Sequence, residues 1–124
     1  IAVTGEGNST TTNLQQGLAK AWATFNATGT AATRDTFNVS GLTDNGTGDF
    51  SFAFSSNFAT ANAYVAGGLV AHSSQSDATY TLRAYSSSTL TTSSARMNMV
   101  YNTDSAQGVS DYAYGSTLMH GDLA

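Results

Sequence analysis

The chain of 124 residues contains no cysteine and no proline, and only 10% of its residues are charged. Without cysteine, neither a disulfide nor a thiolate metal site can form. Without proline, one common protection of exposed sheet edges is missing. Because a typical soluble domain is about one quarter charged, the 35 serine and threonine residues or partner chains must cover much of this surface.

Basic residues are the scarcest of the charged types. Four Lys and Arg stand against eight Asp and Glu, which gives a net charge of −4. The four basic residues, Lys20, Arg34, Arg83 and Arg96, are scattered along the chain. Neutralisation of phosphates needs clustered basic side chains, so we expect no nucleic-acid partner. No apolar run approaches the roughly 20 residues of a membrane helix, so we expect no membrane insertion.

What the chain does contain is alternation with a period of two, which is typical of half-buried strands. In residues 19–25, three alanines and Phe25 alternate with Lys20, Trp22 and Thr24. Turn-forming residues separate the alternating runs, and Asn-Gly in residues 43–48 suits a tight hairpin. The strands we expect are residues 19–25, 35–40, 50–54, 63–72, 80–85, 96–102 and 112–121.

Seven or so short strands and no convincing helix predict an all-β fold, an antiparallel β-sandwich or jelly-roll-like single domain over residues 18–124. Residues 1–17, rich in small polar residues, are predicted to form an extended N-terminal arm. The pair Gly67-Gly68 predicts a bulge or bend within its strand. The predicted core comprises Phe25, Phe37, Val39, Phe50, Phe52, Phe54, Leu82 and Met99.

The titratable residues show no catalytic or metal-binding pattern. His72 and His120 stand alone near predicted strand ends. Four aspartates flank turns, where their carboxylates accept hydrogen bonds from backbone amides; they are Asp44, Asp49, Asp104 and Asp111. No G-x-S-x-G nucleophile pattern occurs. We therefore expect no enzyme, no catalytic residue, no metal and no cofactor; the rival hypothesis is a polysaccharide depolymerase.

Two features are candidates for binding. Trp22, next to Lys20 on the predicted outer face of its strand, has three interpretations: a subunit-interface anchor, an ordinary core residue or a sugar-stacking platform. The polar loop with Ser73, Gln75 and Asp77 is a candidate receptor-contact loop, because recognition on rigid β scaffolds is carried by loops.

The segments KAWATFNATGT (residues 20–30) and RDTFNVSGLTDNGTGDFSFAF (residues 34–54) resemble a β-domain of tail fibre and spike proteins of tailed bacteriophages, marine ones especially. The resemblance extends over residues 17–54, is looser afterwards, and returns in the closing LMHGDLA of residues 118–124. Ala32-Thr33 departs from the pattern, in which more apolar residues precede the arginine.

The resemblance implies a structural or adhesive module of a virion, with no catalytic residue, acting as a homo-oligomer and commonly as a trimer. It further implies other virion proteins and a host cell-surface glycan or protein as partners. Two alternatives are open: a capsid decoration or tail connector protein without receptor binding, and a secreted carbohydrate-binding module.

Overall fold

The computed structural model describes residues 2–4, 11–13, 17–73 and 78–124. The described chain is all-β, with a short 3-10 turn, η1 (Ser87–Thr89), between two of its strands. The strands are β1 (Ala2–Thr4), β2 (Thr11–Asn13), β3 (Ala21–Asn26), β4 (Ala32–Phe37), β5 (Val39–Gly46), β6 (Asp49–Phe54), β7 (Val65–Ala71), β8 (Thr79–Ala84), β9 (Ser94–Asn102), β10 (Gln107–Val109) and β11 (Tyr114–His120).

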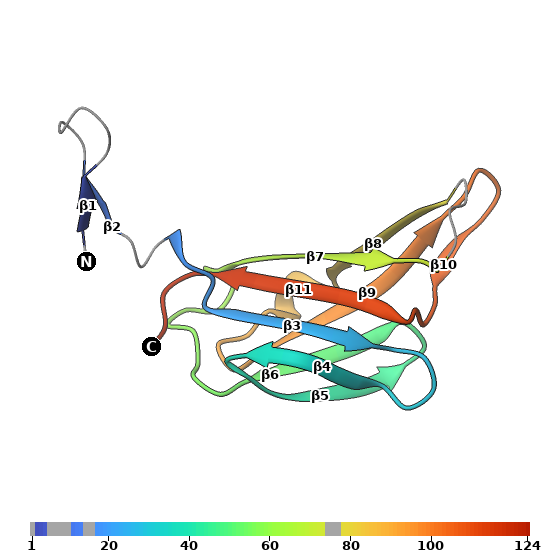
Figure 1. Cartoon of the computed structure of the whole chain (residues 1–124), viewed down its shortest axis with the longest axis horizontal. Coiled ribbons are helices and arrows are strands. Elements are labelled where there is room, and N and C mark those ends of the chain that lie inside the picture. Colours follow the sequence, from blue (N-terminus) through green and yellow to red (C-terminus); the bar gives the residue numbers. More distant parts are fainter. Residues whose placement is uncertain (1, 5–10, 14–16, 74–77) are drawn as a thin grey trace.

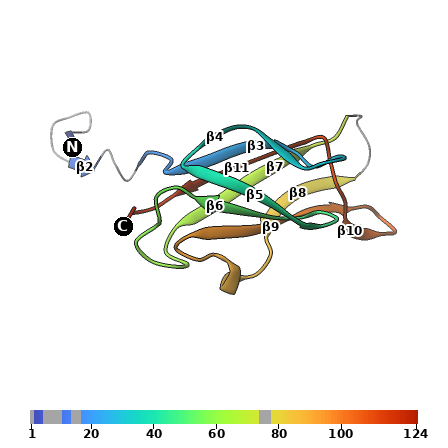
Figure 2. The same cartoon turned by 90° about the horizontal axis from the view of Figure 1, so that it is seen from below.

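Strands β3 to β11 form two antiparallel sheets that pack face to face (Figures 1 and 2). The four-stranded sheet has the order β4-β3-β11-β7. The five-stranded sheet has the order β10-β9-β6-β5, with β8 also paired to β9. This is the β-sandwich that the alternation predicts, so the predicted fold class is confirmed.

The predicted N-terminal arm is described only in part. Strands β1 and β2 pair with each other and form a separate two-stranded sheet, which Figure 1 shows beyond one end of the sandwich. Residues 1, 5–10 and 14–16 of the predicted arm lie outside the described residues.

The sandwich has nine strands rather than about seven. A short strand, β10, lies in the predicted loop after β9, and the predicted strand over residues 35–40 is divided into β4 and β5. The division falls at Asn38, whose φ of 55° is left-handed, a conformation that asparagine adopts more readily than most residues. The Asn38 side chain holds this corner, because its Nδ2 donates to the carbonyls of Lys20 at 2.9 Å and Ser56 at 3.0 Å.

The corner at Asn38 makes one core prediction wrong. In a continuous strand Phe37 and Val39 would share a face, and both were predicted to be buried. The left-handed residue between them breaks this alternation and carries the chain from one sheet to the other. Val39 is buried, whereas Phe37 is 52% exposed on the outer surface of the four-stranded sheet.

The other predicted core residues are buried between the sheets. Phe25 of β3 meets two rings of β6, with centroid distances of 5.5 Å to Phe50 and 5.1 Å to Phe52. A second aromatic group closes one end of the core, where Phe58 stacks on Tyr64 at 4.2 Å and meets the edge of Phe54 at 4.9 Å. Methionines fill the remaining space; they are Met97, Met99 and Met119.

The predicted bulge at Gly67-Gly68 is absent from β7, which pairs with β11 in one unbroken register. Gly68 is there for a different reason. A Cβ at this position would lie 2.5 Å from the Ser116 carbonyl oxygen of the neighbouring strand β11 and 2.8 Å from Leu82 Cδ2 of the facing sheet, so there is no space for a side chain. A Cβ on Gly67 would meet nothing within 4 Å.

Candidate functional site

The outer surface of the four-stranded sheet begins at Trp22. On β3, the residues that alternate with Trp22 are buried, and Trp22 itself is partly exposed. Trp22 pairs with Phe37 of β4 on one side and with Leu118 of β11 on the other. Because directly paired residues project from the same face, the three side chains form one row across the sheet.

Strand β7 extends this row with further apolar side chains. Leu69 pairs with Ser116 and Val65 pairs with His120, two register positions to either side of the pair Leu118 and Gly67 and therefore on the same face. Val65 is 71% exposed and Leu69 is 51% exposed. We call this surface the apolar face; its residues are Trp22, Phe37, Val65, Leu69 and Leu118.

Exposed apolar side chains are concentrated on this side of the described molecule. Nine large apolar side chains are exposed in the described residues. Four belong to the apolar face, and Tyr114 lies on the same outer surface through its place on β11. Leu18 and Leu123 line an adjoining groove, which leaves Tyr85 and Val109 elsewhere. Because such surfaces are typical of interaction sites, the apolar face is the candidate site of the described molecule.

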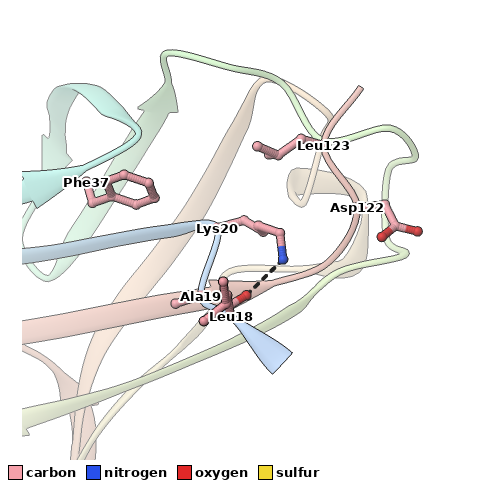
Figure 3. Close-up of a pocket in the computed structure, with 6 residues that line it drawn as sticks. All are labelled: Leu18, Ala19, Lys20, Phe37, Asp122 and Leu123. Atoms are coloured by element: carbon pink, nitrogen blue, oxygen red, sulfur yellow. Dashed lines mark hydrogen bonds between the residues drawn. The ribbon is translucent and has the colours of Figure 1, made fainter. Parts of the chain in front are cut away.

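A groove of about 410 Å³ adjoins the apolar face where β3 begins (Figure 3). Its walls are mostly apolar, and Phe37 belongs to both surfaces. The Lys20 Nζ donates a hydrogen bond to the Leu18 carbonyl at 3.0 Å. We call this hollow the end groove; it is lined by Leu18, Ala19, Lys20, Phe37, Asp122 and Leu123.

The outer surface of the five-stranded sheet is polar by contrast. Arg96 of β9 forms a bidentate ion pair with Asp49 of β6, with Nε at 2.8 Å from Oδ1, and its guanidinium lies 4.0 Å from the centre of the Tyr85 ring. The hydrogen bonds from Arg96 lower the pKa of Asp49, and those to Asp49 raise the pKa of Arg96. The outer surface of the four-stranded sheet therefore carries exposed apolar side chains, whereas that of the five-stranded sheet carries an ion pair.

The structure brings together one pair of predicted site residues. Lys20 lines the end groove, and Trp22 lies beside it on the apolar face. Because Trp22 is on the outer surface, its interpretation as an ordinary core residue is wrong. Of the predicted receptor-contact residues, Ser73 is exposed after β7, and Gln75 and Asp77 lie outside the described residues.

Sequence reasoning did not identify the apolar residues of β7 and β11 as a site. Alternation in those segments indicates which residues share a face, but not whether that face is inside or outside. A partial signal is the size of the side chains: Val65 precedes alanine and Leu69 follows glycine, as Trp22 stands between alanines on β3, but the buried Val70 after Leu69 interrupts the pattern.

His72 lies in an aromatic cluster at the opposite end of the sheets from the end groove. Its ring stacks on Tyr80, with centroids 4.9 Å apart and planes 9° apart, and it meets the edge of Tyr112 at 5.4 Å. His72 is exposed, as expected of a residue at a strand end. Burial raises the pKa of Tyr112.

Turn chemistry accounts for Asp44, which accepts a hydrogen bond from the Gly46 amide at 3.0 Å. Asp111 accepts a long-range hydrogen bond at 2.7 Å from the Gly48 amide, 63 residues away. Asp49 is instead committed to its ion pair. Among the described residues, no three His, Asp or Glu side chains gather in a group that could hold a metal ion.

Comparisons with protein-family models, with curated proteins and with solved structures each find no match. Within the described part of the chain, no helix has the length and apolar character needed to span a membrane.

Proposed function

We propose that this chain is a non-enzymatic structural or adhesive module of a bacteriophage virion, belonging to a tail fibre or spike. The observation that carries the proposal is the apolar face, because it offers a surface for assembly. The segment that resembles phage fibre domains supplies Trp22 and Phe37, which are two of its five residues. A rigid sandwich with polar loops at its ends suits attachment as well as assembly.

The proposed partners follow from the same features. The chain assembles with copies of itself, since its few charges leave it with little protection against association. The resemblance alone supports a trimer, and it also supports contact with other virion proteins and with a glycan or protein of the host surface. The proposed place of action is the extracellular virus particle.

Immunogold labelling of purified particles, viewed by electron microscopy, tests the proposed place. Label on the tail fibres or spikes is expected. Label on the shell or at the tail junction would favour the alternative of a capsid decoration or connector protein, and particles without label would contradict a virion role.

Addition of the purified protein to host cells tests adhesion, and competition with phage adsorption is the expected result.

A carbohydrate-binding module is the second candidate, because the partly exposed indole of Trp22 offers a stacking surface. Binding of the purified protein to a glycan array, lost in Trp22→Ala, would favour this function.

The same protein, incubated with host envelope polysaccharide, is expected to leave the chain length of the polysaccharide unchanged. Shorter products would show a depolymerase instead.

A further inference from the structure

We propose that the apolar face buries against the apolar face of a second copy of this chain. This inference rests on the structural role proposed above, in which copies of the chain assemble, and it names the surface through which they do so. In Figures 1 and 2, no described strand or turn lies over the outer surface of the four-stranded sheet.

The area of the apolar face follows from the dimensions of its sheet. Strands about 4.8 Å apart, with about six residues of about 3.3 Å each, give the four-stranded sheet a surface of about 20 Å by 20 Å. Viewed face-on, this surface therefore measures roughly 400 Å². The relief of its side chains and the adjoining end groove make the accessible area larger than this. Two copies would bury about 800 Å² of this projected area between them, and more with the side-chain relief, which places the contact among the small, weak interfaces below about 1,200 Å².

The charged residues around the apolar face favour contact with a second copy. The apolar face and the end groove are bordered by two basic residues, Lys20 and Arg34, and two acidic residues, Asp35 and Asp122. Among the described residues, the other four acidic and two basic residues carry a net charge of −2. Through its other surfaces the chain repels its own copies, whereas this side is neutral and carries both signs, as a self-complementary interface requires.

The shape of the apolar face also favours contact with a second copy. Gly67 lies in the row of Trp22 and Leu118, and space is open above it. It leaves a shallow place between Val65 and Leu69 that a side chain of the second copy can fill. In a two-fold assembly the whole face of one copy covers the whole face of the other, and each contact between two residues is made twice; in a three-fold assembly one part of the face would meet another part on the next copy.

The test is the oligomeric state of the purified full chain across micromolar concentrations, measured by analytical ultracentrifugation and native mass spectrometry. Leu118→Glu places a charge in the centre of the apolar face. Val109→Glu is the matched control, since the two side chains are similarly exposed, at 45% and 42%, and Val109 lies on β10 of the other sheet. Val65→Glu is a second face variant at the most exposed position of the face.

We expect the unaltered chain and Val109→Glu to form the same oligomer. Leu118→Glu and Val65→Glu should weaken association by about tenfold or more, because a charge is desolvated at the interface. A monomeric unaltered chain would overturn the inference, as would an oligomer that survives both face variants. Circular dichroism of each variant shows that it is folded, and Val65→Glu decides the question where Leu118→Glu does not fold.

Trp22 gives an independent readout because it is the one tryptophan of the chain. Its fluorescence emission should shift to shorter wavelength as the concentration rises, and this shift should disappear in Val65→Glu. An oligomer whose Trp22 emission does not change with concentration would show that another surface is buried. That outcome would overturn this inference and leave the virion role intact, whereas unlabelled particles would contradict the virion role and leave the interface standing.

Discussion

Phe52→Ala is expected to lower the free energy of unfolding by about 3–5 kcal/mol, the range for removal of a buried phenylalanine side chain. Phe52 has no exposed surface, and its ring meets that of Phe25 at 5.1 Å with an interplanar angle of 71°. This edge-to-face contact contributes about 0.5–1.5 kcal/mol beyond burial. A domain of this size is stable by about 5–15 kcal/mol, so the substitution removes a large part of its stability. The midpoint of thermal unfolding should fall by roughly 10 °C or more.

Phe37→Ala is the matched control, because it removes the same atoms from a side chain that is 52% exposed. Its loss should be about 0.5 kcal/mol, the usual upper size for a surface substitution. Urea unfolding followed by far-ultraviolet circular dichroism, at several protein concentrations, separates folding from association. Equal losses in the two variants would refute the assignment of Phe52 to the core and Phe37 to the surface.

Three further substitutions test other parts of the structure. Gly68→Ala should lower the unfolding midpoint and Gly67→Ala should leave it nearly unchanged, because a Cβ would clash at the first position and meet open space at the second; equal midpoints would contradict this close packing around Gly68. Arg96 holds the pKa of Asp49 below its ordinary value, so the stability from this pair is present above a pH of about 4 and is lost as the pH falls through the lowered pKa. Asp49→Asn should therefore be less stable than the unaltered chain at neutral pH, with the difference shrinking in acid. Burial raises the pKa of Tyr64 to about 12, so its contribution to stability should be lost as the pH rises from about 10 toward that value, and Tyr64→Phe should remove one high-pH step from the ultraviolet titration of the tyrosines.

The sandwich could be predicted from the sequence because alternation is a local property. The phenylalanines of β6 and their neighbours in β3 occupy the predicted faces, and seven of eight predicted core residues are buried. Phe37 could not be placed, because its orientation depends on the left-handed conformation of Asn38. That conformation is held by carbonyls of Lys20 and Ser56, which are 18 residues away in either direction.

The candidate site could be predicted only at Trp22 and Lys20. The rest of the apolar face is assembled from β4, β7 and β11, which are distant in the sequence and become neighbours only through the pairing order β4-β3-β11-β7. Read along the chain, Val65, Leu69 and Leu118 each stand next to an apolar residue that is buried, as Leu118 does beside Met119, so the sequence does not show which of the two faces outward. Their significance comes from the register that brings them beside the row of Trp22.

The inner strands of the two sheets show why the apolar face matters. On β9, the inward side carries Ala95 and two methionines, and the outward side carries polar residues such as Arg96, which is the arrangement expected of a sheet with one face in water. On β3, the inward side carries two alanines and Phe25, whereas the outward side carries Trp22, the largest side chain of the chain, followed by the polar Thr24 and Asn26. The four-stranded sheet thus presents apolar side chains on both faces, which is the pattern of a sheet covered on both sides. The core of the sandwich covers one face, and the second copy proposed here covers the other.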